Sequence, residues 1–231
     1  MEGILLVDKP KGWTSFDVVA KVRSLVSKEM ALKPKNVKVG HTGTLDPIAT
    51  GMVIVLVGKK YTKMAEGLTK KDKVYEVEFI LGETSSSYDT ETEVTKISDR
   101  VPERNELKEA IEKFKGDIMQ IPPAFSAIKL NGVRSYDLAR QGKEVELEPR
   151  KVKIISSELL SYEYPIVKMR LDVSSGTYVR SYVRDIGETM KVGAVMSNLR
   201  RTSIGSIKLD DKIRTADNLD IEYIKDNLNK N

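Results

Sequence analysis

The chain has 231 residues, with no cysteine and a single histidine. The lack of cysteine excludes disulfides and thiolate-ligated metals, and one histidine excludes a multi-histidine metal site. The chain has no run of about 18 apolar residues, so no transmembrane helix is predicted. The N-terminus also lacks the apolar centre of a signal peptide. With 40% hydrophobic residues, 32% charged residues and a net charge of +5, we expect a cytoplasmic globular protein with an anionic partner, nucleic acid first.

The first elements of the chain are expected to be a strand, a turn and a helix. Residues 3–7 are an apolar run typical of a strand, and residues 8–13 form a Pro/Gly turn. For Lys9 in that turn, a solvent-exposed side chain and a role in a functional site are equally expected. Thr14 or Ser15 is expected to cap a helix, because apolar side chains then recur at helical spacing: Val18, Val19, Val22, Leu25 and Val26.

The segment 40–51 contains the histidine, His41, and an aspartate, Asp46, on a glycine-bracketed loop. A β-branched and aliphatic run over residues 52–57 follows and predicts a buried strand. A loop tied to the core in this way can hold a catalytic carboxylate. Asp46 followed by proline is also a typical helix cap over residues 47–50, so both interpretations stand on spacing alone.

The middle of the chain alternates strands with a helix. Residues 74–82 alternate apolar and polar side chains, which predicts a strand with one wet face and leaves Tyr75 to face either the core or a ligand. Residues 83–95 are polar and predict an exposed loop. After Pro102, the apolar spacing predicts a helix that ends at Gly116.

Residues 121–129 are expected to be extended, with a tight turn at Asn131–Gly132 and a short helix over residues 134–142. From Lys129 to Lys153 the sequence contains seven basic side chains and four acidic ones. This excess fits either a surface for phosphate backbone or a merely solvated face.

Two strands are predicted at residues 152–160 and 166–173, followed by a helix with a stripe typical of core: Tyr178, Tyr182, Ile186 and Met190. Arg180 lies off that stripe near the helix N-terminus, where the dipole does not favour a cation, so we expect it to meet a carboxylate or phosphate. Residues 193–201 and 220–228 predict two short helices. No linker divides the chain, which predicts a single domain over residues 1–231.

Five blocks in order resemble the TruB family of tRNA pseudouridine synthases and together cover residues 3–205. They are Asp8-Lys-Pro-x-Gly-x-Thr-Ser15, Val39-Gly-His-Thr-Gly-Thr-Leu-Asp-Pro-Ile-Ala-Thr-Gly51, Lys73-x-Tyr75 with Leu81-Gly82, Ile121-Pro-Pro-x-x-Ser-Ala-x-Lys129 with Gly132, Tyr136 and Ala139-Arg140, and Gly176-Thr-Tyr-x-Arg180 with Leu199-Arg-Arg201. The Gly-His-Thr-Gly-x-Leu-Asp-Pro pattern is specific by itself.

The resemblance implies an α+β pseudouridine synthase fold, with a mixed, largely antiparallel sheet flanked by helices and the active cleft across it. It implies that Asp46 is the catalytic residue and that Arg180 pairs with it. Tyr75 would stack on the target base, while Tyr178 and Leu199 would line the uracil pocket. His41 would press into the T loop, and Lys9 would lie near the site as a basic residue. The implied partner is the T stem-loop of tRNA, with no cofactor, metal or membrane, and we expect a monomer.

Two departures from the family pattern stand out. The usual Thr-Asp-Thr after Leu-Gly is Ser85-Ser86-Ser87 here, so an acidic side chain is missing, and Asp89 is a candidate to compensate. Many members also carry a C-terminal RNA-binding PUA module, which we expect to be absent from this chain.

Three functions fit these features. The first is an isomerase acting on T-loop uridine. The second is a T-loop-binding or RNA-folding protein without obligatory chemistry, which would not need Asp46, Tyr75 and Arg180 together. The third is a hydrolase using Asp46 alone, which the lack of a second carboxylate in the same block disfavours.

Overall fold

The computed structural model describes residues 1–130 and 132–229. Its residues group into two compact units, Met1–Tyr75 with Leu199–Asn231, and Glu76–Asn198. Strands β4 (Lys73–Leu81) and β12 (Ala194–Ile204) each contribute residues to both units. The turn predicted at Asn131–Gly132 includes a residue outside the described ranges. Within those ranges, no helix is both long and apolar enough to cross a membrane.

The main sheet has nine strands, with the hydrogen-bonded order β1-β3-β12-β4-β11-β10-β7 and with β2 and β13 added to β3 and β12. The pairs β1–β3, β2–β3, β7–β10, β10–β11 and β12–β13 are antiparallel, and β3–β12 is parallel. The remaining strand bounds are β1 Gly3–Lys9, β2 Val39–Thr42, β3 Thr50–Val57, β7 Gly116–Gln120, β10 Arg150–Glu163, β11 Ile166–Val173 and β13 Ile207–Lys208. The predicted α+β class with a mixed, largely antiparallel sheet is confirmed.

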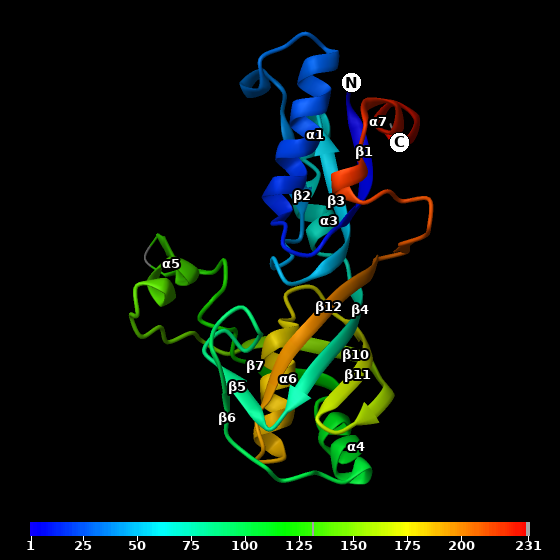
Figure 1. Ribbon diagram of the computed structural model, residues 1–231. Helices are drawn as coiled ribbons and strands as arrows, with labels where there is room; N and C mark the ends of the chain where they lie inside the picture. Colours follow the sequence, from blue (N-terminus) through cyan, green and yellow to red (C-terminus); the bar gives the residue numbers. More distant parts are fainter. Residues whose placement is uncertain (131, 230–231) are drawn as a thin grey trace. The chain divides into compact units, whose positions relative to one another are not determined.

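The first unit is built on the β1–β3 pair, which runs in register from Gly3 opposite Val57 to Lys9 opposite Gly51. Helix α1 (Ser15–Glu29) begins with a capping box between Thr14 and Asp17 and buries its valines, as the spacing predicted. Figure 1 shows α7 (Ile221–Asn227) beside β1, where Ile4 pairs with Asn229. The short elements are η1 Pro34–Asn36, α2 Lys59–Thr62, α3 Ala65–Thr69 and η2 Ala216–Asn218.

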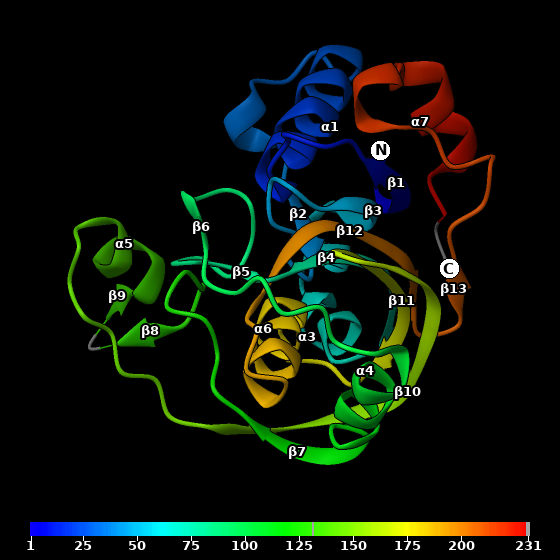
Figure 2. The ribbon, with the colours of Figure 1, turned by 60° about the horizontal axis from the view of Figure 1, so that its bottom comes forward.

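The second unit packs α4 (Arg104–Glu112) against α6 (Val179–Thr189) and β10 (Figure 2). Of the predicted stripe, Tyr182, Ile186 and Met190 are buried in the core, whereas Tyr178, at the N-cap of α6, is half-buried. Two small hairpins and α5 (Ser135–Arg140) complete the unit; their strands are β5 Glu83–Ser85, β6 Val94–Lys96, β8 Lys129–Leu130 and β9 Val133–Arg134. The short helix predicted over residues 134–142 is therefore confirmed as α5.

The helix predicted over residues 193–201 is wrong, because this segment is strand β12. Its side chains alternate about the strand, so Leu199 and Arg201 are buried while Arg200 between them is half-exposed. The alternation of a strand was hidden because one of the inward side chains is a charged arginine. Pairing with β3 outweighs the local helical spacing.

The exposed loop predicted over residues 83–95 is wrong in part: its ends are strands β5 and β6, and three of its residues are buried although most of the others are exposed. Ser85, Ser87 and Asp89 are buried, and the backbone around Asp89 pairs with Met196 of β12. Polar residues suggested solvent, but here their hydroxyl and carboxylate groups bond to one another and to the backbone, which permits burial.

Candidate active site

Asp46 lies on the loop between β2 and β3, in the first unit, and its side chain is half-buried. The Ala49 N–H donates to the Asp46 carbonyl oxygen at 3.1 Å, so residues 46–49 form a single turn, as the interpretation of Asp46 at the start of a short turn expected. Contacts from three other elements hold the loop, which we define as residues 43–52. Each of these contacts is a hydrogen bond to a backbone atom of the loop.

Lys9 provides the first of these contacts. Its side chain is fully buried, so the solvated interpretation is wrong. Nζ donates to the carbonyl oxygens of Trp13 at 2.6 Å, Pro10 at 3.1 Å and Pro47 at 3.4 Å. The Gly12 N–H also donates to the Pro47 oxygen, at 2.8 Å. Lys9 and the turn after β1 therefore hold the residue that follows Asp46.

Ser15 provides the second contact, on the other side of Asp46. The Leu45 N–H donates to Ser15 Oγ at 2.9 Å, and Oγ donates to the Leu45 carbonyl oxygen at 3.4 Å. Both residues are buried. The sequence indicated Ser15 only as a helix cap; nothing in the spacing showed that its hydroxyl faces another segment.

Arg201 on β12 provides the third contact and was not among the predicted site residues. Its Nε donates to the Met52 carbonyl oxygen at 2.8 Å and one terminal nitrogen to the Gly43 oxygen at 2.9 Å. The side chain is fully buried. The motif around Leu199 contained the signal, but the helix predicted there obscured which side chains face inward.

Two further basic groups lie in the field of Arg201. His41 on β2 is half-buried with Nδ1 shielded from solvent, and burial together with the Arg201 charge lowers its pKa. Lys73 is buried at the start of β4; burial first, then Arg201, lower its pKa to about 8, against the opposing effect of Asp72. The lowered pKa values favour the neutral form of His41 and weaken the hold of Lys73 on its proton, so Arg201 is the dominant positive charge of this group.

Tyr75 and Leu199 belong to the same unit and are buried, on β4 and β12. Thr50 Oγ1, at the end of the loop, lies 3.4 Å from the Leu199 carbonyl oxygen. The first unit therefore contains five of the seven predicted site residues: Lys9, His41, Asp46, Tyr75 and Leu199.

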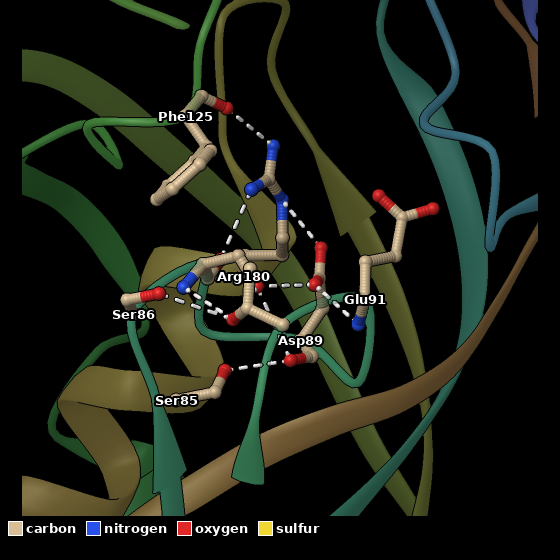
Figure 3. A network of polar contacts seen from close by, with 8 residues as sticks. Ser85, Ser86, Asp89, Glu91, Phe125 and Arg180 are labelled. Atoms are coloured by element: carbon tan, nitrogen blue, oxygen red, sulfur yellow. Dashed lines mark hydrogen bonds and ion pairs between the residues drawn. The ribbon is translucent and has the colours of Figure 1, made fainter. Parts of the chain in front are cut away.

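The second unit contains Arg180 and Tyr178. Figure 3 shows the Arg180 guanidinium between Asp89 and Phe125. Its Nε lies 3.5 Å from Asp89 Oδ2, and its terminal nitrogens donate to the oxygens of Ser87 at 3.0 Å and Phe125 at 2.9 Å. Arg180 is buried and Asp89 fully so. The expectation that Arg180 meets a carboxylate is confirmed with Asp89.

Asp89 is itself held by the serine segment that departs from the family pattern. Ser87 Oγ donates to Asp89 Oδ1 at 2.5 Å, the Glu91 N–H donates to the same oxygen at 3.0 Å, and Ser85 Oγ donates to the Asp89 carbonyl at 2.6 Å. The serines thus orient a carboxylate that comes slightly later in the chain. Asp89 therefore brings an acidic side chain to Arg180 although Ser86 has none, and compensation by Asp89 for the missing acidic residue stays a prediction.

Tyr178 occupies the N-cap position of α6 without a capping hydrogen bond from its side chain, and its backbone bonds to Gln120 of β7. The Tyr178 N–H donates to Gln120 Oε1 at 2.8 Å, and Gln120 Nε2 donates to the Tyr178 oxygen at 3.1 Å. Gln120 is buried and was not predicted. It fixes the start of the helix that carries Arg180.

Among the described residues, no three His, Cys, Asp or Glu side chains gather at metal-binding distances. The first unit thus contains the Asp46 carboxylate, two buried basic side chains bonded to its loop, and the buried side chains of Tyr75 and Leu199. This set can orient a carboxylate and favour its ionised form, and it can hold an apolar or aromatic ring beside it.

Comparison with known proteins agrees with this arrangement. Residues 28–179 match the TruB family pseudouridylate synthase N-terminal domain, and residues 180–230 match the tRNA pseudouridylate synthase B C-terminal domain. The tRNA pseudouridine synthase B of Clostridium acetobutylicum is 43% identical over 99% of this chain and 75% of its own length. The protein of the same name from Bacteroides fragilis is 46% identical over 90% of this chain and 88% of its own length.

Solved structures give the same result. The chain is similar to one in the crystal structure of a Cbf5-Nop10-Gar1 complex, with 30% identity and a TM-score of 0.69 over 97% of this chain and 55% of that chain. It is also similar to one in a structure of an H/ACA RNP bound to a substrate RNA containing 2′-deoxyuridine, with 28% identity and a TM-score of 0.66 over 99% of this chain and 56% of that one. This chain thus spans just over half the length of those two. The family match covers both units, and the chain belongs to the TruB family of pseudouridylate synthases.

Proposed function

We propose that this chain is an isomerase that converts the uridine at position 55 in the T loop of tRNA to pseudouridine, with Asp46 as its catalytic residue. The observation that carries the proposal is the support of the Asp46 loop. Lys9, Ser15 and Arg201, from three elements, bond to backbone atoms on both sides of one carboxylate. Immobilising a reactive group lowers the entropy lost in reaching the transition state.

The reaction breaks the bond from ribose C1′ to uracil N1, turns the base and joins C1′ to C5. Glycoside hydrolases need two carboxylates, because a poor leaving group must be protonated while the second group attacks. Uracil leaves as a comparatively stable anion, so one carboxylate suffices. Asp46 can act as a nucleophile at C1′, add to C6, or remove the 2′ proton, and each route needs its ionised form.

The buried cations supply an environment for that ionised form. Arg201 and the positively charged form of Lys73 favour nearby negative charge, because attraction between opposite charges is stronger at low dielectric. By resemblance to the family, we propose that Arg180 also steadies the Asp46 carboxylate. A guanidinium suits this role because it is planar and permanently charged.

The target uridine must leave the base stack before a protein carboxylate reaches its sugar. We propose that Tyr75 stacks on the extruded base, which is worth about 1–3 kcal/mol per base. His41 would enter the vacated space in the T loop. Leu199 and Tyr178 would keep the pocket dry and protect any covalent intermediate from water.

We propose that the substrate is bound through its phosphates, since the chain carries 39 basic against 34 acidic side chains. We further propose that the protein is a cytoplasmic monomer. In this proposal residues 1–231 form a single catalytic domain, which needs no cofactor.

Release of tritium from an unmodified tRNA transcript labelled at C5 of uridine tests the proposal. Isomerisation replaces the C5–H bond by a C5–C1′ bond and must release the label into water. A protein that only binds the T loop releases none, and a hydrolase liberates free uracil instead. Either of those results would overturn the proposal.

A further inference from the structure

We propose that Arg201 is a positioning residue for the reaction at Asp46, whose guanidinium ties together the two ends of the loop that carries the carboxylate. The inference rests on the proposed function and adds a residue to it. Arg201 acts through the backbone of residues 43–52 and is not assigned any contact with the substrate.

The hydrogen bonds of Arg201 show how the loop ends are joined. Nε donates to the Met52 oxygen at 2.8 Å, and a terminal nitrogen donates to the Gly43 oxygen at 2.9 Å. Asp46 lies between these two acceptors in the chain. Because the guanidinium is rigid and planar, two bonds from it set the spacing and the direction of both carbonyls.

The backbone of Arg201 contacts the same loop. Arg201 pairs in parallel with Gly51, whose φ of +104° favours glycine. A Cβ at Gly51 would lie 2.3 Å from the Arg201 carbonyl oxygen, so no larger residue fits. Gly43 has a φ of +65°, and a Cβ there would lie 3.3 Å from an Arg201 terminal nitrogen. Both ends of the loop are therefore shaped around this one arginine.

The charge of Arg201 is not used in an ion pair. The side chain is 0% exposed, and it forms no salt bridge within residues 1–130 and 132–229. The titratable groups that share its field are His41 and Lys73, which are cationic when protonated. A buried charge partnered by carbonyls alone contributes little to stability compared with an apolar side chain of similar size. Aligning the loop accounts for a group that is otherwise expensive to bury.

The test compares Arg201→Met with Arg201→Lys in the full chain. The single-turnover rate of tritium release and the affinity for the same tRNA transcript are measured side by side. We expect Arg201→Met to slow the chemical step about 100-fold, the effect of a small misplacement of a catalytic group. Affinity for tRNA should change by less than about threefold, because the phosphate contacts that dominate binding lie elsewhere. Arg201→Lys should recover only part of the rate, since an ammonium cannot present a fixed fork to two carbonyls.

Two control variants separate positioning from stability. Ile224→Ala truncates a fully buried side chain of α7, an element that supplies none of the three contacts to the loop, so it should lower stability and leave the rate of folded protein unchanged. Gly43→Ala leaves Arg201 in place but pushes against its guanidinium, and it should slow turnover even if Arg201→Met does not fold.

Each outcome has a distinct meaning. A wild-type rate in Arg201→Met, or in Gly43→Ala where Arg201→Met does not fold, overturns this inference alone. A rate loss in Ile224→Ala equal to that of Arg201→Met would also overturn it, since instability would then explain both. A wild-type chain that releases no tritium overturns the proposed function itself.

Discussion

Two buried cations, Lys9 and Arg201, bond to backbone carbonyls on the loop of Asp46. For Arg201, carbonyl oxygens satisfy the donors without neutralising the charge. The residue-scale consequence is a carboxylate presented by a rigid backbone in a region with surplus positive charge. Such a region favours an ionised aspartate.

We expect Asp46→Asn to abolish turnover and to leave tRNA affinity within about threefold of wild type, because the amide keeps the shape of the side chain but cannot act as nucleophile or base. Tritium release and filter binding measure the two effects. Measurable turnover in Asp46→Ala would remove the catalytic assignment.

His41 can be followed directly, because it is the only histidine of the chain. Burial and the Arg201 charge lower its pKa below the usual value of about 6.5. In an NMR pH titration, we expect the single imidazole resonance of the wild type to give a pKa below that value. In Arg201→Met the pKa should be higher than in the wild type. An unchanged titration in the variant would show that the charge of Arg201 does not reach the imidazole.

The lowered pKa of His41 also makes the stability of the fold depend on pH. As pH falls below about 6.5, the unfolded chain binds a proton at His41 that the folded chain resists. The free energy of unfolding should therefore fall as the pH is lowered from about 6.5 to the folded pKa, and His41→Gln should lose this part of the pH dependence. Urea denaturation over that pH range measures it.

At the scale of elements, the start of α1 has two separate roles in adjacent residues. Thr14 closes a capping box with Asp17, while Ser15 Oγ bonds to Leu45 beside Asp46. The cap stabilises the helix, and the serine joins the helix to the loop. The two residues form a natural pair for comparison.

We expect Thr14→Ala to lower the free energy of unfolding by about 1 kcal/mol with no change in turnover. Ser15→Ala should cost about 1–3 kcal/mol, because the buried Leu45 N–H loses its acceptor, and should also slow turnover about tenfold. Thermal denaturation and tritium release distinguish the pair. Equal rates in the two variants would show that Ser15 has no role beyond the helix.

The β5–β6 hairpin supports Arg180 through Asp89, in a pair whose side chains are 6% and 0% exposed. Removing one partner of a buried ion pair leaves the other uncompensated, at a cost of about 3–5 kcal/mol. We expect Asp89→Asn to lose about this much stability and most of its turnover, with Ser86→Ala, at an exposed serine, as the control. Urea denaturation measures the loss, and wild-type stability would show that the carbonyls of Ser87 and Phe125 are sufficient for Arg180.

At the scale of the whole molecule, the excess of basic side chains predicts a steep fall of tRNA affinity with salt. Arg150 and Lys153 are exposed on β10, within the basic stretch that runs from residue 129 to 153. If they contact phosphates, replacing each by alanine should lower the slope of log affinity against log salt by about 1.

Lys108 on α4 is the matched control, because it is exposed but lies on a helix with Glu106, Glu109 and Glu112. Its replacement should leave the salt slope unchanged. An unchanged slope for Arg150→Ala and Lys153→Ala would instead support the interpretation of that stretch as a solvated face.

Local pattern and specific motifs determined much of this protein from sequence alone. The strand over residues 3–7, the helix begun by Thr14, the apolar run after Asp46 and the α6 stripe all follow from spacing, because each buries one continuous face. The family and the choice of Asp46 came from motifs that hold residue types at fixed spacing.

Only the tertiary structure decided what the buried polar residues do. Lys9, Ser15, Gln120 and Arg201 bond to backbone atoms distant in the chain, and a carbonyl acceptor is present in every residue, so no sequence pattern marks it. For the same reason residues 193–201 were mistaken for a helix and the buried residues within 83–95 for part of an exposed loop. Burial of a charge or a hydroxyl depends on partners that only the folded chain brings within reach.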